Sequence, residues 1–420
     1  MTDSRKTALL ILEQCEKDKS FIDHALHNEL IKSQMDVKDK ALTSELVYGV
    51  IEKQLTLDFF IDELSNIPIN KLQSKVLNII RMALYQIIYL DRIPDSAACN
   101  EAVILSKKFA GLKASGFVNG ILRNFLRKKD ELLSKLNNKP LHIRYSVSKD
   151  ISDMLIEQYG AEKCEEILKA FNIKRPLSIS VNTLKVKPEV LSVKLQGNIV
   201  NDDMIEVSPS GDVRGLYGYK DGYFFVQDRS SAKAVKMLSP KPGETVIDMC
   251  SSPGGKTFKA AILMNNEGKI FSFDISEKKK KLIEEGKSRL GLSIIETGVK
   301  NGREFDPIFF EKADKIICDV PCSGIGVITK KPDIRYKTKN DIEGLLNVQK
   351  DILKVASCYL KPGGDLLYST CTLNKSENEG IIDSFLNEHL GFTLVFMQTI
   401  LPDKDHDGFF ISILRKKQGE

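Results

Sequence analysis

VIDMCSSPGGKT, residues 246–257, is the stretch around which the whole chain is organised. An apolar run ends at Asp248, and a turn of small residues and proline leads into the pair Gly254 and Gly255. A helical pattern follows through Ala260 and Leu263. Glycines let the backbone approach a ligand, and a helix N-terminus offers free N–H groups. The stretch therefore predicts a nucleotide-binding corner. Taken alone, it is equally compatible with a surface turn.

The segment that contains this corner, residues 240–420, alternates between strand and helix patterns. We expect strands at 245–249, 269–273, 293–297, 315–318 and 365–368, helices from Gly255, from Ser276 and over 341–359, and a turn at 361–364. This alternation is typical of a Rossmann-like, doubly wound parallel sheet. Ligands of such sheets bind beyond the carboxyl ends of the strands.

The preceding segment, residues 139–239, predicts a small α/β module. We expect short helices at 151–159 and 162–171 and from Pro188, and strands at 177–181, 204–207 and 223–226. A further helix should follow VQDRSS, residues 226–231, with a serine as its N-cap. The polar run at 134–139 predicts a linker before the module.

The first segment, residues 1–138, predicts an all-α bundle. Apolar residues recur at helical spacing around Leu46, Ile80 and Phe117. What we take as its last helix carries a basic cluster. A charged helix end explains such a cluster, because cations suit the negative end of the helix dipole. Contact with nucleic-acid phosphate is the alternative. The cluster comprises Arg123, Arg127, Lys128 and Lys129.

Composition places the chain among globular proteins. Its 420 residues suggest about three domains, and 42% hydrophobic and 28% charged residues allow sizeable cores. A net charge of +5 does not by itself indicate a nucleic-acid partner. We expect no membrane span and no signal peptide. Eight scattered cysteines without CxxC, and five histidines without ligand spacing, predict reduced thiols, a cytoplasmic protein and no metal site.

Three nucleotide chemistries compete for the corner. A phosphate-binding P-loop needs glycine where Cys250 stands, and the dinucleotide pattern GxGxxG is absent. S-adenosylmethionine fits better, because it carries no phosphate and Asp274, which ends the second strand, can accept from both ribose hydroxyls. The alternative role for Asp274 is a helix cap before Ser276.

Two cysteines follow neighbouring strands of the expected sheet. Cys322 lies in the sequence Asp319-Val320-Pro321-Cys322 after the fourth strand, and Cys371 follows the fifth. Because these strands normally pair, both thiols can face one pocket. The alternatives are two buried cysteines without chemistry or a disulfide, which a reducing compartment disfavours.

The first segment resembles the NusB-like RNA-binding domain. The resemblance rests on DKALTSELVYGV (39–50), RMALYQIIYLD (81–91), IPDSAACNEA (93–102) and GFVNGILR (116–123). The rest of the chain resembles the Nop/Sun family of RNA 5-methylcytosine methyltransferases, most closely its bacterial Sun/Fmu-type ribosomal RNA enzymes. That resemblance rests on VQDRSS, DMCSSPGGKT, CDVPCSGIGV, KPDIRY, YSTCTLNKSENE and DGFF. Together the two cover essentially the whole chain.

The resemblance implies methylation of carbon 5 of a cytosine in small-subunit ribosomal RNA, with S-adenosylmethionine as cofactor. It assigns attack on carbon 6 to Cys371, release of the product to Cys322, and a hydrogen bond to the cytosine to Asp319. The cofactor residues that it implies are Cys250, Ser251, Ser252, Pro253, Gly254, Gly255, Lys256, Asp274, Asn301 and Asp319. Two positions depart from the family: Asn301 replaces an acidic residue that contacts adenine, and Cys-Ser-Ser-Pro replaces Cys-Ala-Ala-Pro.

The resemblance also implies that the first two segments bind RNA, and we expect a monomer. Two other functions stay open from the sequence. One is an RNA-binding scaffold whose methyltransferase domain is inactive, which the presence of Cys371, Cys322, Asp319 and Asp274 disfavours. The other is an enzyme of the same chemistry that acts on transfer RNA. The sequence does not identify the target cytosine or the base that removes the carbon 5 proton.

Overall fold

The computed structural model describes residues 3–18, 22–208 and 212–418. The chain forms two compact units, Met1–Met154 with Lys330–Thr338, and Leu155–Thr329 with Lys339–Glu420. The finer division of the sequence analysis, into 1–138, 139–239 and 240–420, stays a prediction.

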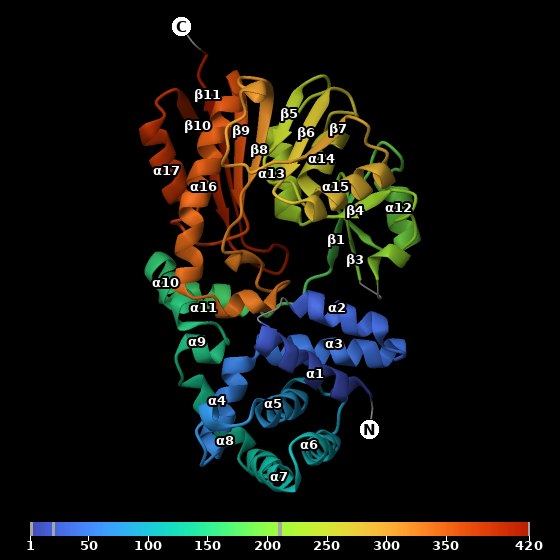
Figure 1. Ribbon diagram of the computed structural model, residues 1–420, viewed down its shortest axis with the longest axis vertical. Helices are drawn as coiled ribbons and strands as arrows, with labels where there is room; N and C mark the ends of the chain where they lie inside the picture. The colour runs from blue at the N-terminus through green and yellow to red at the C-terminus, as the bar shows by residue number, and fades with distance from the viewer. Residues whose placement is uncertain (1–2, 19–21, 209–211, 419–420) are drawn as a thin grey trace. The chain divides into compact units, whose positions relative to one another are not determined.

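The first unit is helical, as predicted (Figure 1). Its central helix is α5 (Ser74–Tyr89), which is buried along most of its length and packs against α1, α3, α4, α6 and α7. Arg81 of α5 is buried and donates to Asp58 at 2.7 Å and to Glu16 at 3.0 Å, so its charge is paired. The other helices are α1 (Asp3–Asp18), α2 (Ile22–Lys32), α3 (Val37–Glu52), α4 (Gln54–Leu64), α6 (Asp95–Phe109), α7 (Leu112–Arg127), α8 (Lys129–Asn137) and α9 (Leu141–Arg144), with α10 (Lys149–Tyr159) running into the second unit.

Two predictions for this unit are wrong. The expected linker at 134–139 is helical as far as Asn137, because α8 buries Leu132 and continues through the polar run. The helix that carries the basic cluster is not the last one, since α8 follows α7; the cluster lies at the end of α7, with Lys129 as the first residue of α8. Arg123, Arg127 and Lys128 are exposed, whereas Lys129 donates to the carbonyl of Ile87 at 3.1 Å.

The segment Lys330–Thr338, which contains the KPDIRY motif, is distant in sequence from the N-terminal helices. It nevertheless packs into the first unit. It forms the 3-10 helix η5 (Pro332–Tyr336) against α3. The Tyr336 hydroxyl donates to the Ile51 carbonyl at 2.6 Å and lies 2.8 Å from Ser146 Oγ. Arg335 is fully buried and donates to the Tyr145 carbonyl at 3.1 Å. This segment is therefore part of the packed interior of the first unit.

The second unit starts within α10 and continues with α11 (Ala161–Ala170) and an antiparallel sheet in the order β2-β3-β1-β4. A core of its own, around Ile179, Ile205 and Phe224, lies between this sheet and α12. The elements are β1 (Leu177–Val181), α12 (Pro188–Leu195), β2 (Asn198–Asn201), β3 (Met204–Val207), η2 (Val213–Gly215) and β4 (Phe224–Val226). The strand β2 was not predicted, because Asn198 and Asn201 interrupt its apolar pattern.

The helix after VQDRSS is α13 (Arg229–Leu238), and its predicted serine cap is wrong. The N-cap is Asp228, whose Oδ1 accepts from the Ser230 backbone N–H at 2.8 Å. A carboxylate at this position also suits the positive end of the helix dipole.

The large sheet of the second unit has the order β10-β11-β9-β8-β5-β6-β7. The five predicted strands pair in parallel, and β11 and β10 extend the sheet antiparallel beyond β9. The strands are β5 (Thr245–Asp248), β6 (Lys269–Asp274), β7 (Ile295–Val299), β8 (Ala313–Asp319), β9 (Leu360–Thr370), β10 (Phe392–Ile400) and β11 (Phe409–Lys416). The predicted turn at 361–364 is wrong, because β9 runs through it with a register shift.

Helices cover both faces of this sheet (Figure 1). Val246, Ile317 and Leu367 pack against α13, α14 (Gly255–Leu263) and α15 (Glu277–Leu290). Residues adjacent to them in sequence, around Ile247, pack against α16 (Lys339–Tyr359) and α17 (Glu379–Glu388). Alternate strand residues thus build two cores, which confirms the Rossmann-like fold.

A buried lysine ties the antiparallel sheet to α14. Lys259 is fully buried, and its Nζ donates to Asp203 Oδ2 at 2.5 Å and to Ser180 Oγ at 3.0 Å. The other oxygen of Asp203 lies 2.7 Å from Lys236 Nζ. Burial lowers the pKa of Lys259, and the carboxylate of Asp203 opposes that shift. The pair therefore depends on both partners staying in place.

Lys259→Ala should lower the free energy of unfolding by about 3–5 kcal/mol, since it leaves Asp203 buried with one of its two lysines removed. Lys269→Ala is the matched control, because Lys269 is exposed and pairs with Glu296 at the surface. That change should cost less than about 1 kcal/mol. Urea unfolding of both variants measures the difference, and equal costs would contradict a structural role for Lys259.

Candidate active site

The loop between β5 and α14 is shaped by backbone contacts to β6. The backbone N–H and the Oγ of Ser251 both donate to the Phe273 carbonyl at 2.8 Å. Gly254 has φ of +110°, and a Cβ there would lie 2.2 Å from the ring of Phe258. Only glycine fits this position, so the sequence of the corner is set by its backbone path.

Asp274 lies beside this loop at the end of β6. Its Oδ2 accepts from the Ser252 N–H at 3.0 Å, and its Oδ1 accepts from the Ile275 N–H at 2.7 Å. The capping alternative for Asp274 is wrong, because the N-cap of α15 is Ser276. Asp274 is thus free of a capping role and is held against the corner.

A cavity of about 170 Å³ opens at the corner. It includes six of the predicted cofactor residues from the loop and α14, together with Asp319. Gly254, Asp274 and Asn301 do not line it. Its walls are Val226, Gln227, Asp228, Ser231, Asp248, Cys250, Ser251, Ser252, Pro253, Gly255, Lys256 and Asp319.

Two buried acceptors in this cavity have no hydrogen-bond partner within the described part of the chain: Asp248 Oδ1 and Gln227 Oε1. The other oxygen of Asp248 accepts from Thr257 Oγ1 at 2.6 Å. Burial raises the pKa of Asp248 to about 7. Unpaired buried acceptors are costly, so a ligand with N–H or O–H donors fits here, as the α-ammonium and ribose hydroxyls of S-adenosylmethionine do.

The sequence analysis did not include Asp248 and Gln227 among the site residues. Both stand inside strings that it singled out, DMCSSPGGKT and VQDRSS. The signal was a charged residue at the end of an apolar strand, since an acidic residue there must either be paired or face a ligand. Asn301 lies away from the cavity walls, where its side chain bonds to Glu304 and to the Arg303 N–H. Its contact with adenine stays a prediction.

Lys256 and Asp319 form an ion pair that lines the cavity at the end of β8. Lys256 Nζ lies 2.6 Å from Asp319 Oδ2 and 5.2 Å from the centre of the Phe409 ring. Asp319 Oδ1 accepts from Ser369 Oγ at 2.8 Å. Since β8 and β9 pair Asp319 with Ser369, the sheet register holds this carboxylate in place.

Cys322 and Cys371 meet as predicted from the order of the strands. Their sulfur atoms are 3.3 Å apart, within hydrogen-bond range for thiols and far beyond a disulfide bond of about 2.05 Å. The hydrogen bond to Cys371, and then burial, hold the pKa of the Cys322 thiol well above its usual value. Burial also raises the pKa of Cys250. In the Cys322–Cys371 pair, Cys322 is thus held as a protonated thiol beside the sulfur of Cys371.

The DGFF motif closes one side of these strand ends. The Gly326 N–H donates to the Cys371 carbonyl, and the Gly408 N–H donates to the Gly326 carbonyl, each at 2.9 Å. A Cβ on Gly326 would lie 2.1 Å from the Gly408 carbonyl oxygen, so the segments meet through glycine. The loop before Gly408 is therefore in direct backbone contact with the segment after Cys322.

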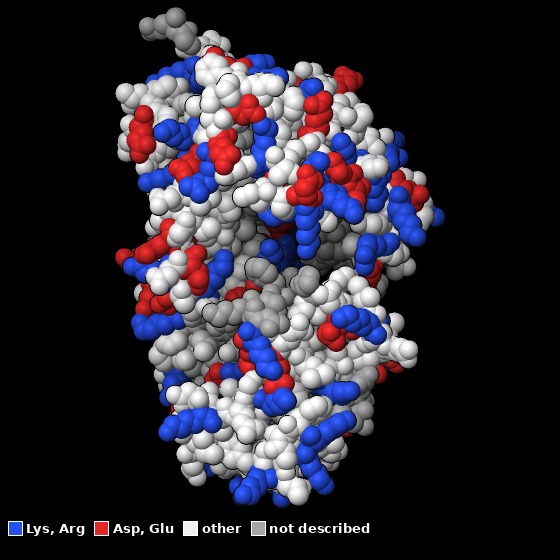
Figure 2. Space-filling model, in the orientation of Figure 1, with Lys and Arg blue, Asp and Glu red and all other residues white. Residues whose placement is uncertain are grey.

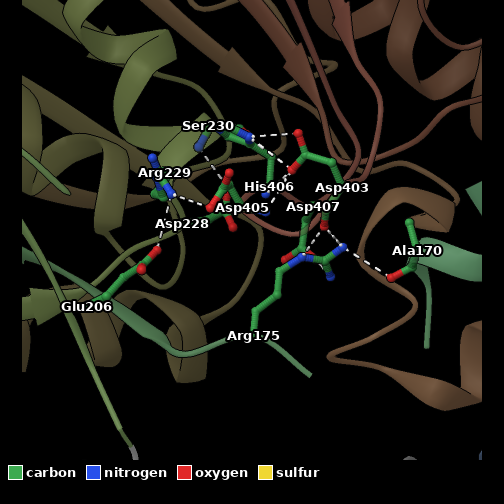
Figure 3. Close-up of polar contacts among 10 residues, drawn as sticks. All are labelled: Ala170, Arg175, Glu206, Asp228, Arg229, Ser230, Asp403, Asp405, His406 and Asp407. Carbon is green, nitrogen blue, oxygen red and sulfur yellow. Dashed lines mark hydrogen bonds and ion pairs between the residues drawn. The ribbon is translucent and has the colours of Figure 1, made fainter. Parts of the chain in front are cut away.

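Two arginines anchor that loop, Arg175 before β1 and Arg229 at the start of α13 (Figure 3). Arg175 donates to Asp407 Oδ1 at 2.8 Å and to the Asp403 carbonyl at 2.9 Å. Arg229 lies 3.3 Å from Glu206 and 3.5 Å from Asp405. The Arg175–Asp407 pair is buried, and the sequence analysis did not identify it because the partners are distant in the chain.

The surface adds little to the assignment. Figure 2 shows basic and acidic side chains interspersed over the visible face of the second unit. Among the residues that the structure describes, no group of three or more His, Cys, Asp or Glu side chains could hold a metal ion. No helix in the described ranges is long and apolar enough to cross a bilayer.

Comparison with known proteins agrees with the fold. A family model described as 16S rRNA methyltransferase RsmB/F matches residues 235–415, and the NusB family model matches residues 2–127. The probable ribosomal RNA small subunit methyltransferase B of Bacillus subtilis (strain 168) is 32% identical over 450 residues, which cover 99% of both chains. The solved structure of PH0851 is 25% identical, with a TM-score of 0.80 and 99% of both chains covered. A methyltransferase homolog from Pyrococcus horikoshii is 29% identical, with a TM-score of 0.59, over 66% of this chain and 97% of its own.

The Rossmann-like sheet and the glycine corner with its cavity, together with the match to the methyltransferase family model, identify an S-adenosylmethionine-dependent methyltransferase. The chain belongs to the ribosomal RNA small subunit methyltransferase B family, and its N-terminal unit contains a NusB domain. The residues of the cavity fit S-adenosylmethionine, the cofactor of that family. The resemblance noted from the sequence is therefore confirmed.

The raised pKa of Asp248 predicts a pH-dependent stability of the cofactor-free protein. A carboxyl group whose pKa is higher when folded stabilises the fold fully at low pH and loses that contribution as the pH rises through the folded pKa of about 7. Relative to Asp248→Asn, the unfolding free energy of the wild type should fall by up to about 1.4 kcal/mol per pH unit between about pH 4 and pH 7, and then level off. Urea midpoints of both proteins across this range test it. A constant difference would contradict a raised pKa.

Proposed function

We propose that this protein methylates carbon 5 of a cytosine in small-subunit ribosomal RNA through a covalent bond between Cys371 and carbon 6. The observation that carries the proposal is the 3.3 Å separation of Cys322 and Cys371, beside the Lys256–Asp319 pair. One site thus holds two thiols, a fixed carboxylate and a cofactor cavity. The cofactor supplies an electrophilic methyl group.

Attack by Cys371 solves the main chemical difficulty, which is that carbon 5 of cytosine is a poor nucleophile. When the thiolate forms a bond to carbon 6, the electrons of the carbon 5–carbon 6 double bond become available at carbon 5. The Cys322 thiol, kept protonated by its raised pKa, can donate to the Cys371 sulfur and favour its thiolate form. Cys371 directly follows β9, and its carbonyl accepts from the Gly326 N–H at 2.9 Å.

Asp319 is placed to bind the polar edge of the base. It would accept from the exocyclic amine of cytosine while Lys256 and Ser369 keep the carboxylate in one orientation. A carboxylate that is already oriented needs little reorganisation when charge develops on the ring. Asp319 also lines the cofactor cavity, so it stands between the two reactants.

Release of the product needs two bond changes. The proton on carbon 5 passes to a general base, and the electron pair of its C–H bond re-forms the double bond to carbon 6. The bond to Cys371 breaks with its electron pair on sulfur, so that Cys371 leaves as a thiolate to which the Cys322 thiol can donate. We assign Cys322 to this step, because its sulfur lies 3.3 Å from that of Cys371. The side chain of Asp319 is 34% exposed, so it remains accessible to the cytosine during product release.

We further propose that a single copy acts in the cytoplasm. One chain contributes both cysteines and every wall of the cofactor cavity, so a second copy is not needed for the site. No disulfide joins the cysteines of the described residues, which is compatible with a reducing compartment. The exposed Arg123, Arg127 and Lys128 would contact RNA phosphate in the NusB-like domain.

Cys371→Ala should abolish methyl transfer and leave cofactor affinity nearly unchanged, because Cys371 is not a wall of the cofactor cavity. The measurements are transfer of a radiolabelled methyl group to 16S rRNA and calorimetry of the cofactor. Retention of more than about a hundredth of wild-type turnover, equivalent to about 2.7 kcal/mol in the barrier, would mean that another group attacks the base.

Cys322→Ala should still form the bond to RNA and transfer the methyl group but release product slowly. The protein–RNA adduct should then persist on denaturing gels, whereas the double variant with Cys371→Ala should give none. If Cys322 only fills space, the single variant should be mildly destabilised and no adduct should appear.

A further inference from the structure

A fully buried carboxylate lies behind the two cysteines. Glu377, in the turn between Cys371 and α17, has no exposed surface. Its carboxylate accepts four hydrogen bonds, two at each oxygen, as an ionised carboxylate can. The donors are the Ser323 N–H at 2.8 Å and Gln349 Nε2 at 3.0 Å to Oε1, and Ser323 Oγ at 2.5 Å and Asn374 Nδ2 at 3.2 Å to Oε2.

These contacts hold the loop of Cys322 from both sides. Ser323 follows Cys322 directly and gives Glu377 both its N–H and its hydroxyl. Gln349 of α16, which binds the same carboxylate, also donates to the Pro321 carbonyl at 3.0 Å. The residues before and after Cys322 are therefore both fixed through Glu377.

The next residue in sequence holds the other cysteine. Asn378 Oδ1 accepts from Thr370 Oγ1 at 2.6 Å, and Asn378 Nδ2 donates to the Thr372 carbonyl at 3.0 Å. Thr370 and Thr372 flank Cys371, and both they and Asn378 are buried. One amide side chain thus spans the backbone turn that carries Cys371.

We propose that Glu377 and Asn378 are positioning residues that divide the two cysteines between them: Glu377 holds Cys322 for product release, and Asn378 holds Cys371 for attack on the base. The inference rests on the proposed function, since it assigns a separate step to each cysteine. Neither residue touches the substrate; each acts through the loop that it fixes.

The identity of each side chain fits its task. Glu377 faces donors only, so an amide in its place would turn N–H groups toward two of them. Its negative charge also contributes, after the hydrogen bond to Cys371 and burial, to raising the pKa of Cys322. Asn378 faces one donor and one carbonyl, which an amide satisfies and a carboxylate does not.

Two isosteric changes separate the roles. Glu377→Gln should leave methyl transfer in a single turnover close to wild type but lower multiple turnover about a hundredfold, because a misplaced release group acts only after transfer. The protein–RNA adduct should accumulate on denaturing gels, as in Cys322→Ala. Cofactor affinity should not change.

Asn378→Asp should have the opposite effect. It keeps the acceptor for Thr370 but sets a carboxylate oxygen against the Thr372 carbonyl, which displaces Cys371. Single-turnover transfer should fall about a hundredfold, and no adduct should accumulate.

Glu379→Gln is the matched control. Glu379 lies two residues after Glu377, and its carboxylate accepts from Thr399 Oγ1 of β10 at 2.8 Å rather than from the cysteine loops. The kinetics of this variant should match the wild type. Ser323→Ala is the alternative variant if Glu377→Gln does not fold. It removes the hydroxyl hydrogen bond to Glu377 and keeps the one from the backbone N–H. It should trap less adduct than Cys322→Ala.

The outcomes distinguish this inference from the function on which it rests. If Cys322→Ala traps adduct and folded Glu377→Gln does not, the role of Glu377 is overturned while the covalent mechanism stands. Equal loss of transfer and release in both isosteric variants would reduce Glu377 and Asn378 to structural residues. If Cys322→Ala itself traps nothing, the release step and the role of Glu377 fall together.

Discussion

The parallel pairing of β8 with β9 is the constraint on which the site depends. It aligns Asp319 with Ser369, so that two loops about 50 residues apart in the chain leave the sheet side by side. Neighbouring parallel strands are hydrogen-bonded along their length, so their ends cannot separate without breaking the ladder. The short distance between Cys322 and Cys371 follows from that register, together with the buried polar network behind them.

The cofactor corner uses the same edge of the sheet in a different way. There a glycine with positive φ and contacts from Ser251 to β6 form the cradle, and acceptors such as Asp248 Oδ1 are left for a ligand. Lys256 connects the cofactor corner with the cysteine site. It lies in the first turn of α14, and its side chain pairs with Asp319 at the end of β8. Polar groups that are costly in a closed core are thus concentrated where reactants bind.

Much of this arrangement could be predicted from the sequence. The alternating pattern after residue 240 indicated the sheet, and the order of its strands placed both cysteines together. What could not be predicted depends on distant partners: the pairing of Arg175 with Asp407, or the binding of Ser323 to Glu377. Local patterns also failed at 361–364, where turn-forming residues lie inside β9 as an irregularity between the pairs Ala313–Leu360 and Lys315–Asp365.

The placement of Lys330–Thr338 has a consequence for how the protein is made. Because Tyr336 and Arg335 belong to the packed interior of the helical unit, that unit is discontinuous in the chain. Synthesis proceeds at about 5–20 residues per second, so more than 180 further residues must be made after Met154 before Lys330–Thr338 is complete and can pack against the N-terminal helices. The chain therefore cannot complete its first compact unit before most of its second has been synthesised, and a construction that ends near residue 154 would lack that element altogether.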